Sequence, residues 1–83
     1  ILHVTHLDYQ GGHKLALRFD DSTEGLVDLA QDLDGEVFHP LQDPKYFAQA
    51  RLEGGTVVWP NGADLAPEYL RDKIANKPIE ATA

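Results

Sequence analysis

Two pairs of adjacent glycines, Gly11-Gly12 and Gly54-Gly55, each interrupt a stretch rich in β-forming residues. Neither pair stands before a helix that carries the lysine of a phosphate-binding loop, so both pairs are typical of β-hairpin turns. The predicted strands are residues 1–9 with 13–19, and residues 50–53 with 56–59. Two hairpins in a chain of 83 residues favour a small, mostly antiparallel sheet.

The register of the first hairpin depends on the length of its loop. A three-residue loop at residues 10–12 pairs Leu7 with Leu15 and sets Asp8 opposite Lys14. A two-residue Gly-Gly turn instead sets Asp8 against Leu15 and loses the opposite-charge pair. We therefore predict the three-residue loop.

The segment between the hairpins predicts three shorter elements. Residues 24–29 resume an extended pattern and form a third strand, which makes a meander with the first hairpin. Residues 30–41 are interrupted by a glycine and a proline, and predict only a short helical turn or a packed loop. Asp43 is the expected N-cap of a short helix with Pro44 at its first position.

The last predicted element is a helix that starts at Asp64 or Ala66 and has Pro67 in its first turn. Asn76 followed by Pro78 is expected to end it. Its apolar stripe consists of Ala66, Leu70 and Ile74.

These elements predict the α+β class, with a meander plus a hairpin, a short central helix and a C-terminal helix. The chain is too short for a second core, so we predict one domain over residues 1–78 and a disordered tail over residues 79–83.

Charge is unevenly distributed along the chain. There are 7 basic and 14 acidic residues, for a net charge of −7. Residues 20–43 contain eight of the acids and no Lys or Arg, so this segment repels phosphate backbones and we expect no direct nucleic-acid binding. A basic protein or a hard cation would be attracted, although a plain solvated acidic surface explains the same composition. The acids are Asp20, Asp21, Glu24, Asp28, Asp32, Asp34, Glu36 and Asp43.

Nucleophilic catalysis lacks its usual residues, because the chain has no cysteine and its only serine, Ser22, lies in a polar turn. We therefore predict a non-enzymatic protein without a cofactor. The absence of cysteine fits a reducing cytoplasm. No apolar run approaches the roughly 20 residues that a membrane-spanning helix needs, so we expect no membrane association.

Metal binding is not expected either. Strand alternation places His3 and His6 on opposite faces. The sequence Asp32-Leu33-Asp34-Gly35 matches half of a calcium loop, but Ala30 and Leu41 then occupy the two anchoring ligand positions.

Trp59, the only tryptophan, lies at a strand end beside Pro60 and is interpreted either as a core aromatic packed on the last helix or as an exposed recognition anchor. The candidate interaction surface combines it with nearby polar residues and with the acidic segment. This surface consists of Trp59, Asn61, Asp64, Asp28, Asp32, Asp34 and Glu36.

A longer pattern marks a family. The chain reads Leu-Val-Asp-Leu at 26–29, Val-Phe-His-Pro-Leu at 37–41 and Trp-Pro-Asn-Gly-Ala-Asp-Leu-Ala-Pro-Glu at 59–68. Over residues 9–70 it resembles the bacterial domain-of-unknown-function 2442 family, and departs from it at Asp21-Ser22-Thr23, where relatives commonly turn with Asp-Gly. The resemblance implies a compact α+β domain with no assigned activity. Some relatives continue into a helix-turn-helix domain, and others are apparently encoded beside a second small protein, as in toxin–antitoxin pairs.

Two functional hypotheses follow. The first is a non-enzymatic interaction or regulatory module, the acidic partner of a small basic protein. The alternative is a ligand- or metal-responsive sensing domain of a transcription-regulator system. We also expect a two-fold homodimer through the edge of residues 1–9, which carries few charged or proline residues that would block pairing.

Overall fold

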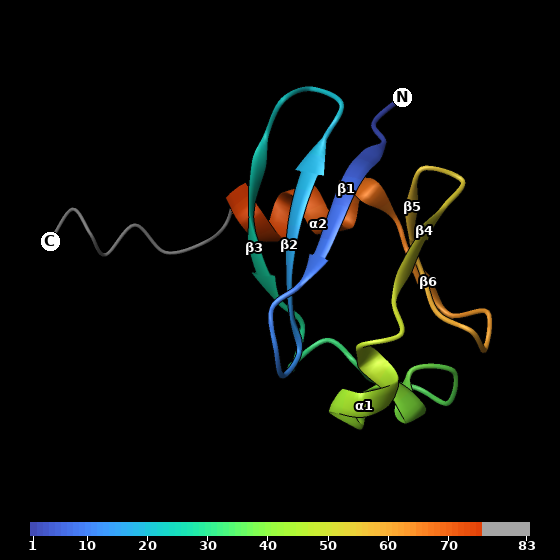
Figure 1. The fold of residues 1–83 in the computed structure, drawn as a ribbon. Coiled ribbons are helices and arrows are strands. Elements are labelled where there is room, and N and C mark those ends of the chain that lie inside the picture. Colours follow the sequence, from blue (N-terminus) through green and yellow to red (C-terminus); the bar gives the residue numbers. More distant parts are fainter. Residues whose placement is uncertain (76–83) are drawn as a thin grey trace, which may run out of the picture.

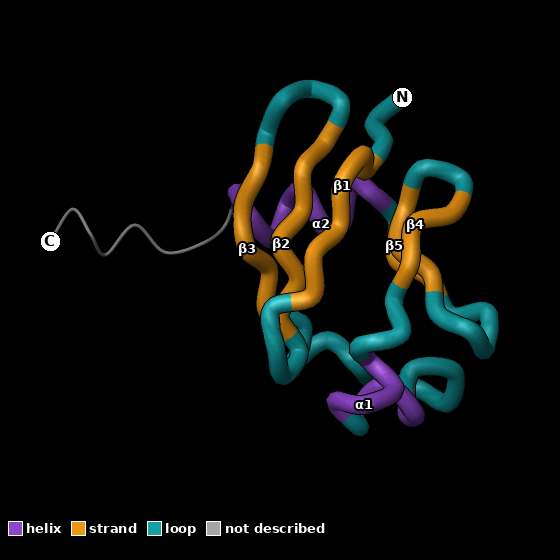
Figure 2. The backbone as a smooth tube through the Cα atoms, in the orientation of Figure 1, coloured by secondary structure: helices purple, strands orange, loops and turns teal. Residues whose placement is uncertain are grey.

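The computed structural model describes residues 1–75 and confirms the α+β class (Figures 1 and 2). Its strands form two three-stranded antiparallel sheets. Sheet A has the order β1 (Val4–Tyr9), β2 (Lys14–Phe19) and β3 (Glu24–Asp28). Sheet B has the order β4 (Arg51–Glu53), β5 (Thr56–Val58) and β6 (Asp64–Leu65). The helices are the 3-10 helix η1 (His39–Gln42), α1 (Pro44–Phe47) and α2 (Pro67–Ala75).

Most of the predicted elements are confirmed. The Asp43 carboxylate accepts a hydrogen bond from the Lys45 amide at 3.0 Å and caps α1. Strand β6 was not predicted, because two residues are too few to show an alternating pattern; it pairs Leu65 with Val57. The predicted helix end at Asn76 and Pro78 and the predicted tail at 79–83 lie outside the described residues.

The predicted register of the first hairpin is wrong by two residues. Leu7 pairs with Leu17, and Asp8 pairs with Ala16 instead of Lys14. An even shift keeps every side chain on its own face of the sheet, so the burial of apolar residues does not distinguish the two registers. The conformation of the turn selects the register. The Lys14 amide donates to the Gly11 carbonyl at 3.0 Å, which makes the loop longer than predicted.

A bulge at Thr5 changes the direction of the first strand. Val4 pairs with Phe19, but the next pair is His6 with Arg18, so Thr5 has no opposite residue. The extra residue turns Val4 toward the core, where it is buried. The Val4 amide then donates to the Gly55 carbonyl of the β4–β5 turn at 2.7 Å and joins the two sheets.

This junction bears on the homodimer expected through residues 1–9. The strand itself begins only at Val4, whose amide is already bonded to Gly55, and β1 contacts both β4 and β5. The edge is therefore partly covered within the chain, and is less open than the sequence indicates.

One hydrophobic core lies between the two sheets, α1 and α2. Trp59 is 1% exposed and is the largest of its fully buried side chains. Its indole N–H donates to the Phe47 carbonyl at 2.9 Å, and the two ring centroids are 5.5 Å apart. Burial of Trp59 in the core is confirmed, and the exposed-anchor interpretation is wrong. Its hydrogen bond and ring contact are with Phe47 of α1, whereas the prediction placed it against the last helix.

Helix α2 covers only one face of sheet A, and lies behind β1–β3 in Figure 1. Its Ile74 packs so closely on β3 that a Cβ atom added to Gly25 would lie 3.0 Å from the Ile74 Cγ2 atom. Gly25 therefore sets the depth at which the helix sits on the strand.

We expect Trp59→Ala to lower the free energy of unfolding by about 3–5 kcal/mol, because it leaves a large cavity and removes one of the two hydrogen bonds that the Phe47 carbonyl accepts. Chemical denaturation with unchanged slope measures the loss. The matched control is Val37→Ala at a side chain that is 45% exposed, which should change stability by less than about 0.5 kcal/mol. Near-normal stability of the Trp59 variant would contradict its place in the core.

We expect Gly25→Val to cost about 1–3 kcal/mol, because the new side chain collides with Ile74. When Gly25→Val is already present, Ile74→Ala should cost less than it does in the wild type, with a coupling of at least about 0.5 kcal/mol. Leu26→Val, at the next residue but on the other face of β3, is the control and should show no coupling to Ile74.

Candidate functional site

The face of sheet A that is turned away from α2, here called the open face, is the candidate site. It carries the alternate residues of each strand, because successive side chains of a strand point to opposite sides. The side chains on the buried side of β2 and β3 include Leu15, Leu17 and Val27. The open face consists of His6 and Asp8 from β1, Lys14, Ala16 and Arg18 from β2, and Glu24, Leu26 and Asp28 from β3.

The strand register orders the open face into columns. Strand β2 presents a base, a small residue and a base, in the order Arg18, Ala16 and Lys14. Strand β3 presents an acid, an apolar residue and an acid, since Glu24 pairs with Arg18 and Asp28 pairs with Lys14. Between these acids lies Leu26, which pairs with Ala16 and is 40% exposed.

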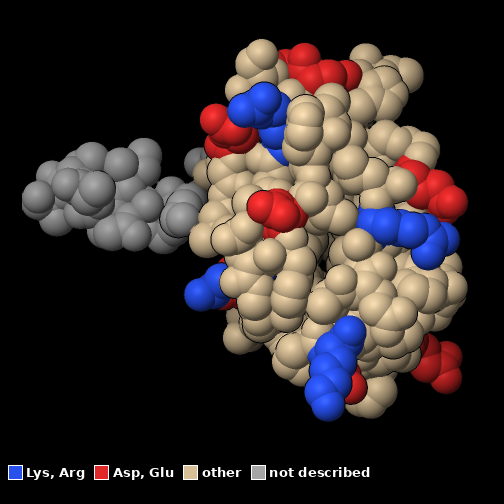
Figure 3. Space-filling view, viewed as in Figure 1, with Lys and Arg blue, Asp and Glu red and all other residues tan. Residues whose placement is uncertain are grey.

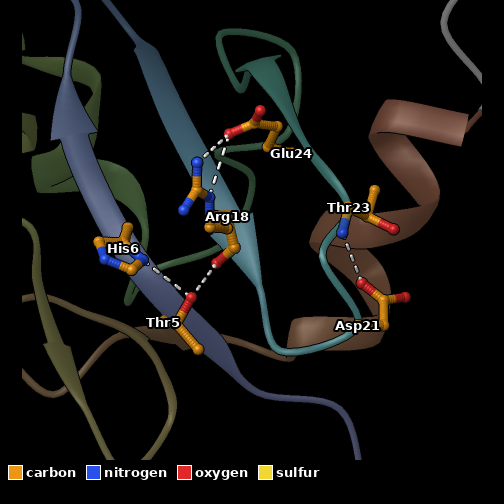
Figure 4. A network of polar contacts seen from close by, with 6 residues as sticks. All are labelled: Thr5, His6, Arg18, Asp21, Thr23 and Glu24. Atoms are coloured by element: carbon orange, nitrogen blue, oxygen red, sulfur yellow. Dashed lines mark hydrogen bonds and ion pairs between the residues drawn. The ribbon is translucent and has the colours of Figure 1, made fainter.

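Polar contacts hold one end of this face in place (Figure 4). Arg18 donates from Nε and Nη2 to the Glu24 Oε1 atom, at 3.1 and 3.0 Å. The Thr5 hydroxyl donates to the Arg18 carbonyl at 3.2 Å. Because that uses its only hydrogen, the His6 Nδ1–H donates to the Thr5 Oγ1 atom at 3.0 Å.

A shallow groove of about 500 Å³ runs over the middle of the open face. The small side chain of Ala16 leaves space between its longer neighbours. The open-face residues that line the groove are His6, Asp8, Ala16, Arg18 and Glu24. Such a groove can accept an apolar side chain at its floor and charged groups at its rim.

The structure divides the predicted interaction surface into separate regions. Trp59 is buried and is no part of a surface. Asn61 is exposed but has a structural role, since its Nδ2 donates to the Val37 carbonyl at 2.8 Å and its Oδ1 accepts from the Ala63 amide at 3.0 Å. Asp64 is exposed on β6, and only Asp28 belongs to the open face.

Half of the acidic segment is paired within the chain. Four of its eight acids bind a basic or histidine side chain: Asp20 to His3 at 2.9 Å, Asp21 to Arg71 at 3.2 Å, Glu24 to Arg18 at 3.0 Å, and Asp32 to Lys73 at 2.9 Å. Asp34 and Glu36 are exposed. Acidic and basic side chains are accordingly interspersed on the face seen in Figure 3. The segment is not one uncompensated acidic surface.

Two of these four carboxyl groups, those of Asp20 and Asp21, have lowered pKa values. The side-chain hydrogen bond from His3, followed by its backbone hydrogen bond, lowers the pKa of Asp20 below 3.8. Hydrogen bonds from Thr23, with a smaller effect of Arg71, lower the pKa of Asp21. The folded state therefore favours the ionised form of both carboxyl groups. Their stabilisation is present above pH 3.8 and is lost as the pH falls through the lowered pKa values.

His3, His6 and His13 have structural partners, which for the first two are Asp20 and Thr5. The His13 Nε2–H donates to the carbonyls of Leu41 and Gln42 at 3.1 and 2.9 Å, and its ring packs edge-on against Phe47. Over residues 1–75, no group of three or more potential ligands is arranged to hold a metal ion. Within the same part of the chain, none of the helices has the length and apolar character to cross a membrane.

Residues 4–76 match a family described as protein of unknown function, DUF2442. The chain belongs to the DUF2442 family. No curated protein and no solved structure matches it. The resemblance in the sequence is thus confirmed, and it covers nearly the whole chain.

The Trp-Pro-Asn-Gly segment of this DUF2442 domain is a structural element. The Trp59 amide donates to the Ala63 carbonyl at 2.9 Å, and the Gly62 amide donates to the Trp59 carbonyl at 2.9 Å. Gly62 has a φ of +90°, which side chains disfavour. This turn sends β6 back beside β5, while Asn61 fixes the loop at Val37. The segment that identifies the family thus maintains its fold.

The predicted surface omitted all of the open face except Asp28. The signal that could have found it is strand alternation on β2, where Lys14, Ala16 and Arg18 alternate with buried Leu and Phe residues. The acidic run drew attention instead, since its pairing with distant bases such as Arg71 and Lys73 cannot be read from local sequence.

Tyr69 gives a direct test of this pairing. Its hydroxyl donates to the Asp32 Oδ1 atom; this hydrogen bond, then burial, then the charges of Asp32 and Asp34 raise the pKa of Tyr69 to about 12. The neutral phenol is favoured in the folded state. Its stabilisation is therefore present below pH 10 and is lost between pH 10 and about 12.

We expect Asp32→Asn to lower the Tyr69 pKa toward 10, because the charged acceptor is removed. Tyrosinate absorbance during a pH titration measures it, with Tyr69→Phe used to subtract the other tyrosines. Asp28→Asn removes the same charge elsewhere and should leave the titration unchanged. A Tyr69 that titrates near 10 in the unaltered protein would contradict the contact.

Proposed function

We propose that this DUF2442 domain is a non-enzymatic protein-interaction module that binds through the open face of sheet A. The observation that carries the proposal is that, within residues 1–75, this sheet has a helix and a core on one side only, and a groove with the exposed Leu26 beside it on the other. A single exposed leucine is ordinary on a protein surface, so the proposal rests on the whole face, with its groove and its paired columns of charge beside Leu26.

A binding role also fits the state of the polar side chains. His13 and Asp32 have the chemistry of catalytic groups, yet both side chains are bound to structural partners. His13 donates to backbone carbonyls of η1, and Asp32 accepts hydrogen bonds from side chains of α2. The groove itself is shallow, and its charged side chains Arg18 and Glu24 are bound to each other. These features support recognition of a surface over chemistry on a small substrate.

Net charge narrows the class of a heterologous partner. With −7 overall, the domain attracts a basic protein at long range and repels nucleic acid. The pairing of Asp20, Asp21, Glu24 and Asp32 within the chain means that the acidic segment alone does not define the contact. We propose that a basic partner is drawn by the overall charge and is positioned by the open face.

Photo-crosslinking tests this proposal. A Leu26→benzoylphenylalanine variant, made in the native host and irradiated, should give adducts of discrete mass that mass spectrometry can identify. Leu26 is suitable because it is exposed and contributes little to the core.

Val37→benzoylphenylalanine is the matched control, because Val37 is similarly exposed but lies beside Asn61 and away from sheet A. Adducts from position 26 alone support the open face. Adducts from position 37 alone, or none from position 26, would contradict it and move any interaction to another surface.

A further inference from the structure

We propose that the open face pairs with the open face of a second copy of this chain, in a two-fold dimer in which each strand runs parallel to the same strand of the other copy. This inference rests on the proposed role of the open face as a contact surface. Its occupant, a second copy at −7, differs from the basic protein proposed above and competes with it for the same face. It is carried by the arrangement of charge and size in the β2 and β3 columns.

Two sheets that pack face to face keep their strands within about 30° of one another, so a pair of identical faces has two arrangements. A two-fold axis across the strands places each column over its own reversed copy. Arg18 then faces Lys14 of the second copy, and Glu24 faces its Asp28. Like charges meet at all four charged positions of the two columns, which disfavours this arrangement.

A two-fold axis along the strands, between β2 and β3, gives the opposite result. It places the β2 column of each copy over the β3 column of the other without changing the order along the strand. Arg18 then faces Glu24 of the second copy, and Lys14 faces its Asp28. Each of the four charged positions meets an opposite charge, twice over by symmetry.

Size is complementary in the same arrangement. The middle of the β2 column is Ala16, which forms the floor of the groove, and the middle of the β3 column is the exposed Leu26. The axis along the strands sets Leu26 of one copy over Ala16 of the other. A large side chain thus enters the space that a small one leaves, on both sides of the axis.

The opposing effect is the net charge of −7 on each copy. At 0.15 M salt the screening length is about 8 Å, so repulsion between whole molecules is largely screened while contact pairs persist. The open face has only eight side chains, which places the contact among weak, small interfaces. We therefore expect dissociation constants between about 10 µM and 1 mM.

The experiment uses two single substitutions. Arg18→Glu leaves acids at positions 18 and 24, and Glu24→Arg leaves bases at both. Each variant alone should lose self-association by about tenfold or more, because two attractive contacts become repulsive. In an equimolar mixture, position 18 of each variant faces an opposite charge at position 24 of the other, so association should return.

Arg51→Glu and Glu53→Arg form the matched control. They alter an exposed ion pair on β4 and produce the same net charges, but lie off the open face. Each should associate as the wild type does. Leu26→Asp should also abolish the dimer, whereas Val37→Asp should not. Sedimentation equilibrium measures all of these.

Three results would overturn the inference: a wild type that stays at 9.2 kDa up to about 1 mM, a mixture that does not restore association, or an equal loss in the β4 controls. A monomeric wild type that still gives a heterologous adduct from position 26 would overturn self-pairing and leave the proposed function standing. Absence of any adduct from that position would overturn the proposed function itself.

Discussion

The hydrogen-bonded burial of Trp59 is the interaction on which the rest of the structure depends. Two three-stranded sheets, each marginal by itself, share one core, and the indole ring fills its centre. The bond from its N–H to the Phe47 carbonyl ties β5 to α1 and satisfies the one polar atom that the ring takes into the core. The turn at Asn61 then fixes the preceding loop against the same region.

A feature of this fold can be predicted from the sequence when the residues that form it lie close together in the chain. The hairpin turns, the Asp43 cap and the start of α2 follow from residues near one another in the chain. The register of β1 on β2 does not, because an even shift leaves the buried set unchanged and only the loop conformation and the bulge at Thr5 select the observed pairs. Strand β6 exists because Val57 and Val58 supply its partners, which no pattern in residues 64–65 could indicate.

Electrostatics shows the same distinction between local and long-range information. A run of acids without a base reads as an acidic surface, but the compensating bases lie elsewhere in the chain, on β2 and α2. Net charge therefore governs attraction and repulsion at long range, while the alternating charges of the β2 and β3 columns govern the contacts that a bound partner makes. The open face could have been found from alternation alone, since Arg18 and Asp28 each lie between two buried apolar residues on neighbouring strands.

The bond between Val4 and Gly55 joins the beginning of the first strand to a turn near the far end of the described chain. During synthesis, the hairpins of sheet A leave the ribosome long before Gly55, Trp59 and Leu70 do. Contacts of such high sequence separation close loops late and slow the search for the native state. Until they form, the core around Leu15, Leu17 and Val27 lacks the later residues that complete it, Val57, Trp59 and Leu70. In that stage the apolar side of sheet A is incompletely covered, and transient exposure of this kind favours aggregation.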